Sequence, residues 1–265
     1  MIPMLRKSLW DLRWTAFWYA AGGAIYIFAI ALFYPTVREQ AETFTKLVAV
    51  YPKAVLAIFG FTDLTTYTGF MGTETLNLIW PAVIIVFATL GGSAVVAKEV
   101  EDGTAELLLS VPARRWRLLL AKEAALGIGL LGTVVAAALA LVIGAVVVSA
   151  SVKADGLLAM TVVMAAFLCT VAAYTSLFSS VTSSRGAAAG MSLGVTVAFY
   201  LIWVVATLGD SWKWLKNLSI FTAYTPQKAL ETGSIDAVPI AILVAITAAC
   251  VLLALVAFER RDAVA

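Results

Sequence analysis

Histidine is absent from this chain of 265 residues, and cysteine occurs only twice. The lack of histidine removes the commonest general base and the commonest transition-metal ligand. Cys169 and Cys250 each lie within a long apolar run, where a free thiol usually serves as a small buried hydrophobic side chain. We therefore predict neither a metal site nor a disulfide.

Charge is scarce as well. Charged residues make up 13% of the chain and hydrophobic residues 62%, with a mean hydropathy of +0.98, whereas soluble domains have roughly 25% and 45–50%. No soluble fold of this size could bury so much apolar surface, because even large domains leave about a quarter of it in water. These numbers exclude a soluble enzyme, a secreted disulfide scaffold and a nucleic-acid binder, and they indicate a polytopic membrane protein.

Six apolar runs are each about as long as a membrane-spanning helix, which needs roughly 20 residues. None of them contains Asp, Glu, Lys or Arg. We predict an all-α membrane protein whose residues 1–265 form a single transmembrane domain. The six predicted spans are 17–34, 76–97, 124–150, 156–180, 187–208 and 237–258.

The distribution of lysine and arginine predicts the orientation. If the N-terminus is cytoplasmic, the inside segments hold eleven basic residues and the longer outside segments hold seven. Cytoplasmic loops carry the excess of basic residues, so we expect both termini in the cytoplasm and the protein in the cytoplasmic membrane. The first span is too long for a signal peptide, and we interpret it as a retained span.

Three segments outside the spans are amphipathic or aromatic. Residues 1–16 place leucines, tryptophans and basic residues as an interfacial helix would, although an ordinary basic and aromatic flank of the first span explains them too. Residues 35–75 favour amphipathic helices that either cap or gate an external opening. Residues 209–236 carry tryptophan and lysine, which is typical of anchoring at the membrane surface.

The spans offer no titratable group for an ion-coupled carrier, since a functional carrier usually keeps one inside the membrane. The chain also has no glycine-rich phosphate-binding loop, so we expect no catalysis and no bound nucleotide in it. Polar residues inside the spans are candidates for a substrate path, with interhelical hydrogen bonding as the simpler alternative. The candidates are Thr89, Ser93, Thr196 and Tyr200.

The loop 98–123 is the most informative segment. An acidic cluster precedes Gly103, after which Thr104 can cap a short helix over 105–110 that Pro112 ends. Nothing in the loop would bury its leucines, so this helix suits an apolar pocket on a soluble partner. The alternative is a solvated loop whose arginines only fix the topology.

This pattern of acidic residues, Gly-Thr, three leucines, Ser-x-Pro and an arginine-rich turn resembles the permeases of type-2 ABC exporters. MLRKSLWDLRW, YPKAVLAIFG, DLTTYTGF and AFERRD are similar to segments of bacterial permeases for exotoxin or antibiotic export. In that family the loop holds a coupling helix that docks on a separate ATPase subunit. The resemblance implies docking through Glu99, Glu101, Gly103, Thr104, Glu106, Leu107, Leu108, Pro112 and Arg115, with a second contact through Ser184, Arg185 and Gly186.

The resemblance also implies a function. We expect the membrane-spanning subunit of an exporter that moves a lipophilic or amphipathic compound, such as a drug, toxin or peptide, out of the cell. Two ATPase subunits would bind ATP and Mg²⁺, and a second permease copy would complete a homodimer in contact with membrane lipids, without nucleic acid. The alternatives are an ATP-independent carrier or channel, and a non-transporting membrane anchor that recruits an ATPase.

Overall fold

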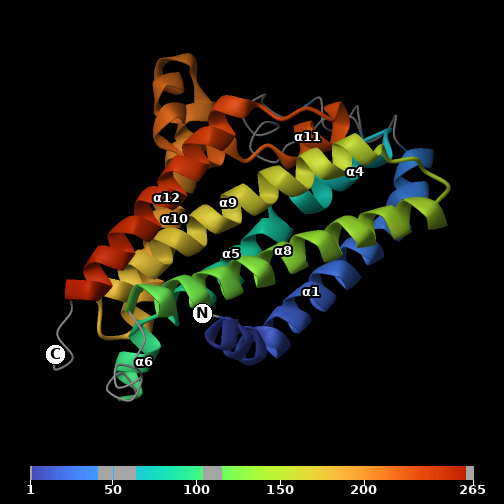
Figure 1. Cartoon of the computed structure of the whole chain (residues 1–265). Helices are drawn as coiled ribbons and strands as arrows, with labels where there is room; N and C mark the ends of the chain where they lie inside the picture. The colour runs from blue at the N-terminus through green and yellow to red at the C-terminus, as the bar shows by residue number, and fades with distance from the viewer. Residues whose placement is uncertain (1, 41–49, 51–63, 104–114, 261–265) are drawn as a thin grey trace.

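The computed structural model describes residues 2–40, 50, 64–103 and 115–260, and the regular elements among them are all helical (Figure 1). Five helices are long and apolar enough to cross a membrane. They are α1 (Ile2–Glu39), α8 (Arg115–Val147), α9 (Ala154–Val181), α10 (Arg185–Leu208) and α12 (Ala237–Arg260). A sixth candidate is the pair of helical segments Tyr67–Leu76 and Ile79–Ser93, which are bent by 44° at their junction. The all-α membrane fold is thus confirmed.

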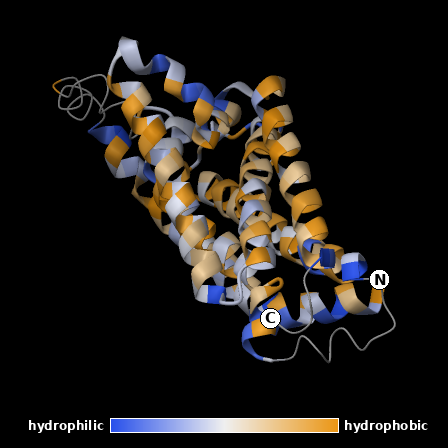
Figure 2. Cartoon of the chain, turned by 90° about the vertical axis from the view of Figure 1, so that its left-hand side faces the viewer, coloured by the Kyte–Doolittle hydropathy of each residue, from blue (hydrophilic) through white to orange (hydrophobic). Residues whose placement is uncertain are grey.

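Short elements complete the two ends of the bundle. One end, called proximal here, holds the start of α1, the end of α12 and α6 (Ala97–Glu101) (Figure 1). The opposite, distal end holds the remaining short elements. These are α4 (Tyr67–Met71), the π-helical turn η1 (Gly72–Leu76), the 3₁₀ segments η2 (Asp210–Leu218) and η3 (Ile220–Ala223), and α11 (Pro226–Thr232). The hydrophilic residues gather toward these ends (Figure 2).

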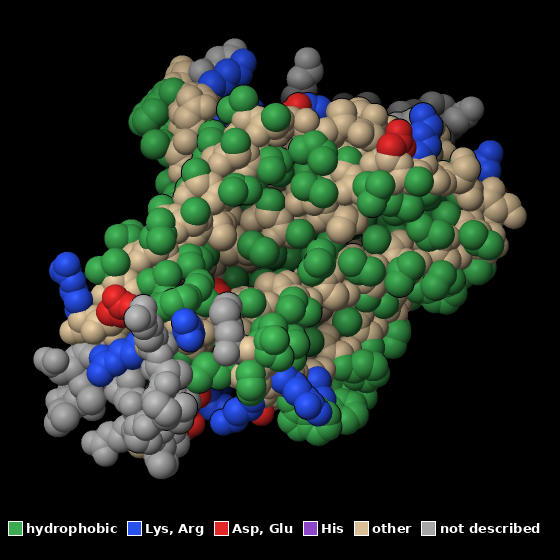
Figure 3. Space-filling view, viewed as in Figure 1, with side chains coloured by type: hydrophobic (Ala, Val, Ile, Leu, Met, Phe, Trp, Pro, Cys, Tyr) green, Lys and Arg blue, Asp and Glu red, His purple; other side chains and the backbone are tan. Residues whose placement is uncertain are grey.

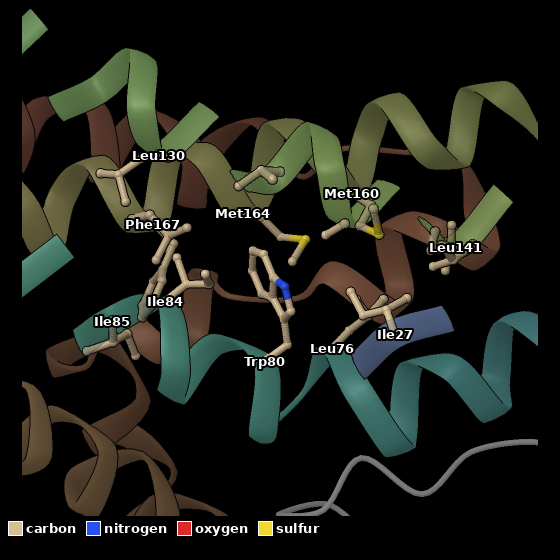
Figure 4. Packing of buried hydrophobic residues seen from close by; sticks show 14 of the residues in the cluster. Ile27, Leu76, Trp80, Ile84, Ile85, Leu130, Leu141, Met160, Met164 and Phe167 are labelled. Atoms are coloured by element: carbon tan, nitrogen blue, oxygen red, sulfur yellow. The ribbon is translucent and has the colours of Figure 1, made fainter. Parts of the chain in front are cut away.

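The core lies between α5 (Ile79–Ser93), α8 and α9. Trp80, Ile84, Met164 and Phe167 are almost fully buried and point toward one another (Figure 4). Large apolar side chains on the outer faces of α1, α8, α10 and α12 remain exposed, and Figure 3 shows them as a broad hydrophobic band between charged ends. Such a band is what a lipid bilayer covers. The chain is therefore a multi-pass integral membrane protein.

Three predicted spans agree closely with the helices, and a fourth agrees in part. The spans predicted at 156–180, 187–208 and 237–258 correspond to α9, α10 and α12 within two residues at each end. The span predicted at 124–150 corresponds to α8, but α8 already starts at Arg115. Lys122 and Glu123 therefore belong to this long helix, whereas the apolar runs alone placed every charge outside the spans.

The beginning of the chain differs from the prediction. The interfacial helix expected at 1–16 and the first span expected at 17–34 are one continuous helix, α1, which passes Pro35 and ends at Glu39. No proline lies between Pro3 and Pro35, and a proline in the first turn does not interrupt a helix. Figure 2 shows the first part of α1 lying across the proximal end of the bundle, so this part is placed as an interfacial helix would be.

The second span also differs, because it is broken. Instead of one helix over 76–97, the structure has η1, a break at Asn77 and Leu78, and then α5, which ends at Ser93. Pro81 explains the break, since its ring would clash with the carbonyl of residue 77 in a continuous helix. The helices predicted within 35–75 lie largely outside the described residues, and the described part Tyr67–Leu76 packs into the bundle.

Hydrogen bonds from the segment before α12 satisfy the polar groups at this break. Asn77 Nδ2 donates to Gln227 Oε1 at 2.6 Å, and Tyr224 Oη donates to the Leu76 carbonyl at 2.8 Å. Burial raises the pKa of the Tyr224 hydroxyl, so this group stays protonated as a donor. These hydrogen bonds join segments at the distal end that are far apart in the sequence.

Candidate functional site

Ser179 joins three elements at the proximal end. Its Oγ accepts hydrogen bonds from the backbone N–H groups of Val96 (3.0 Å) and Ala97 (2.8 Å), and donates to the Ser93 carbonyl at 2.8 Å. Val96 is the N-cap of α6 but contributes no side-chain cap. Ser179, on α9, supplies that cap instead, satisfying donors that a helix start leaves unpaired. The end of α5, α6 and α9 are thus held together by one buried hydroxyl.

Lys122 attaches α6 to α8. Its Nζ donates to Glu99 Oε1 at 2.7 Å and to the Val95 carbonyl at 2.9 Å. Both side chains of the ion pair are largely shielded from solvent, with 16% and 27% of their surfaces exposed. Such a pair fixes a geometry better than a fully exposed one, whose members move freely.

Arg185 connects α6, in the loop 98–123, with the start of α10. Its backbone N–H donates to Glu101 Oε2 at 2.7 Å, and its guanidinium Nη2 donates to the Leu90 carbonyl at 3.3 Å. Ser184 is the N-cap of α10, with its hydroxyl accepting from the Ala187 N–H at 3.5 Å. The carboxylate of Glu101 is therefore placed at the start of α10, where a helix favours negative charge.

A small apolar cluster packs the segment at the start of α6 against the bundle. Val95, Val96, Leu119, Ala254 and Phe258 are buried together, which ties the turn before α6 to α8 and α12. After α6, Gly103 adopts a positive φ of 67°, a conformation that glycine reaches without the cost paid by other residues. The chain thus leaves α6 by a sharp turn at a defined place.

The sequence pattern of the family described as ABC-2 family transporter protein matches residues 25–263. The chain belongs to the ABC-2 transporter family. No curated protein matches it. The chain is thus the permease, or membrane, subunit of an ABC transporter, and the resemblance to type-2 ABC permeases is confirmed.

Several residues expected to dock the ATPase are brought together in this ABC-2 permease. Glu99 and Glu101 lie on α6, Gly103 follows the end of this helix after one intervening residue, and Arg185 lies beside Glu101. Arg115, the first residue of α8, starts the helix that carries Lys122. Ser184 and Gly186 flank Arg185 at the start of α10. Thr104, Glu106, Leu107, Leu108 and Pro112 lie outside the described residues.

The residues expected along a substrate path are positioned inside the ABC-2 permease subunit. Thr89 and Ser93 on α5 are 1% and 0% exposed. Thr196 shares a hydrogen bond of 2.5 Å with the Tyr174 hydroxyl, which links α9 and α10. Tyr200 packs against Trp203 and Phe221. Interhelical hydrogen bonding accounts for Thr196, and a role of these residues in substrate passage stays a prediction.

Sequence reasoning missed the two residues that organise this region. Ser179 carries no signal of its own, because a serine in an apolar run usually bonds to its own helix. Lys122 gave a weak signal. Three leucines shortly before it, at 118–120, indicate that a helix starts before the apolar run at 124. Both become visible only when α6, α8 and α9 are placed in space.

Proposed function

We propose that this ABC-2 permease is the membrane half of an ATP-driven exporter and that its proximal face docks a separate ATPase. The observation that supports this best is the hydrogen bond between Glu101 and the Arg185 backbone, which unites the two loops expected to contact the ATPase. A partner surface that meets one loop would necessarily meet the other. Two ATPase copies would bind ATP and Mg²⁺, and two permease copies would form the path.

The attachments of α6 supply a route for coupling. Glu99 is paired to α8 through Lys122, and the start of α6 is held by Ser179 of α9. A displacement of the docking loop would therefore move α8 and α9 together rather than bend a free loop. The cargo would be a lipophilic or amphipathic compound, since the spans offer apolar walls and few charges.

The orientation proposed for this function puts the proximal end in the cytoplasm. Most of the described basic residues lie there, and cytoplasmic segments carry such an excess. They are Arg6, Lys7, Arg13, Lys98, Arg115, Arg117, Lys122, Arg185 and Arg260. An ATPase that draws on cytoplasmic ATP has to dock at that end.

Glu101→Ala tests the docking proposal. A hydrogen bond to a charged group contributes about 1.5–3 kcal/mol when buried, and we expect about 1 kcal/mol here because this bond is exposed. Stimulation of ATP hydrolysis by the permease should fall about fivefold. Leu108→Asp should go further and release the ATPase on purification. Glu259→Ala, an exposed carboxylate on the same end of the bundle, should change neither quantity.

Three results would contradict the proposal. Transport by the permease reconstituted without any ATPase would show an ATP-independent carrier or channel. A stable complex with the ATPase that hydrolyses ATP but moves no compound would show a membrane anchor instead. Equal behaviour of Glu101→Ala, Leu108→Asp and Glu259→Ala would remove the loop from the mechanism.

A further inference from the structure

A cavity of about 290 Å³ lies at the proximal end, between the first part of α1 and the helices α5, α8 and α10. Its polar side is formed by five charged residues from four segments of the chain. They are Asp11, Lys98, Glu99, Lys122 and Arg185. Its other side is apolar, with Leu12, Phe87 and Leu126. The cavity therefore has a charged half and a hydrophobic half.

The charges in this cavity are not balanced among themselves. Glu99 is paired with Lys122 at 2.7 Å. Two further cations of the lining, Lys98 and Arg185, are accompanied there by a single remaining carboxylate, Asp11, which is exposed to solvent. The Glu101 carboxylate, which is not part of the lining, accepts a hydrogen bond from the Arg185 backbone. The Nε of Arg185 is buried and has no hydrogen-bond partner among the described residues. A buried guanidinium nitrogen without a partner costs free energy. The positive charges of Lys98 and Arg185 outnumber the one remaining carboxylate of the lining, and an anion bound in the cavity would balance them.

A second, mainly apolar cavity of about 340 Å³ lies along the seam of α1 and α8. Leu12 lines both cavities. The second one is lined further by Leu9, Ala16, Ile128 and Gly129. A side chain at Gly129 would approach Leu12 Cδ2 to 2.9 Å, so Leu12 packs closely on this glycine and forms the wall that the two cavities share. The charged cavity and the apolar groove therefore lie on the two sides of Leu12.

The position in the bundle identifies the source of an anion with an apolar tail. Trp10, Trp14 and Trp18 are all exposed on the same part of α1, and tryptophan is enriched where the hydrocarbon of a bilayer meets its headgroups. The charged cavity thus lies at headgroup level and the apolar groove lies at the level of the acyl chains. A membrane lipid meets both requirements at once.

We propose that this pair of cavities binds a phospholipid of the adjacent leaflet, with its phosphate on Lys98 and Arg185 and one acyl chain along α1 and α8. Arginine and lysine together suit a phosphate, because the guanidinium offers directed donors and the ammonium a compact charge. The volume of the charged cavity lies near the lower end of small-ligand sites, which suits a headgroup. The lipid would bridge α1, α6 and α10 beside the docking loops.

Lipid retention on the purified permease measures this binding without ATP or an ATPase. The chain is purified in a neutral detergent and mixed with phosphatidylglycerol, phosphatidylethanolamine or an uncharged glucosyl diacylglycerol with the same acyl chains. Native mass measurement should show both phospholipids retained at least fivefold more than the glycolipid. Inorganic phosphate at millimolar concentration should not displace them, because it cannot occupy the apolar groove.

Variants locate the bound lipid. Lys98→Gln removes a charge from the cavity, and Thr15→Phe fills it without changing charge; each should lower phospholipid retention at least threefold. Arg260→Gln removes the same charge from an exposed position of the same end, outside the cavities, and should retain lipid like the unchanged protein. Equal retention of the glycolipid, displacement by phosphate alone, or equal losses in Lys98→Gln and Arg260→Gln would overturn the proposal. None of these outcomes depends on whether the protein exports anything.

Discussion

Ser179→Ala should detach the start of α6 from α9, at a cost that follows from the hydrogen bonds of this serine. The substitution removes one oxygen that serves two backbone donors and one backbone acceptor. Ser179 is 0% exposed, so water cannot replace the lost contacts in place. Each buried donor left unpaired costs about 1–3 kcal/mol, and the carbonyl of Ser93 loses less because carbonyls tolerate a missing partner better. The expected total is about 2–5 kcal/mol.

Thermal unfolding of the purified permease is the first assay for this variant. At about 2–4 °C per kcal/mol for a chain of this size, Tm should fall by at least about 4 °C. Stimulation of the ATPase should also fall, because α6 would no longer be held by α9. Thr161→Val on the same helix is the matched control, since among the described residues its hydroxyl bonds only to the Leu157 carbonyl, at 2.7 Å within α9. If both variants unfold at the same temperature, Ser179 does not hold the junction together and the reasoning fails.

Two further predictions concern helix packing and orientation. Gly156→Ala would place a methyl group against the Leu230 carbonyl and should destabilise the protein by about 1–3 kcal/mol. The control Gly190→Ala, whose methyl group would have no atom within 4 Å, should not lower Tm. Equal effects of the two substitutions on Tm would contradict the close packing of α9 and α11. In a background with Cys169 and Cys250 replaced by alanine, a cysteine at Thr65 in the distal segment should react with a membrane-impermeant maleimide in intact cells. A cysteine at Glu259 at the proximal end should resist it, and labelling at Glu259 would reverse the orientation.

Periodicity and apolar length were sufficient to predict the main helices. The apolar runs that form α9, α10 and α12 begin and end at charged or turn-forming residues. The limits of these helices therefore depend on residues next to them in the sequence. Loop chemistry likewise predicted that the acidic cluster ends at Gly103, whose positive φ agrees. These features depend on residues close together in the chain.

The remaining features depend on distant residues and could not be predicted in this way. Pro81 within the run at 76–97 favours a break, but the hydrogen bonds that Gln227 and Tyr224 make to Asn77 and Leu76 come from residues 150 and 148 positions away. The placement of Arg185 against Glu101 joins residues from two different loops. The prediction assigned Lys122 and Glu123 to a loop. Hydropathy marks only the apolar part of a helix, and α8 starts nine residues before its apolar run.

The break in the second span has a consequence for how the chain is assembled during synthesis. Asn77 and Leu76 reach the membrane early, but their partners Gln227 and Tyr224 follow 150 and 148 residues later. An unpaired carbonyl or amide in hydrocarbon costs several kcal/mol, so these two polar groups have to be satisfied in another way until residues 224 and 227 have been translated. The hydrogen bonds of the broken span are therefore completed only when most of the chain has been made, although residues 76 and 77 are translated early.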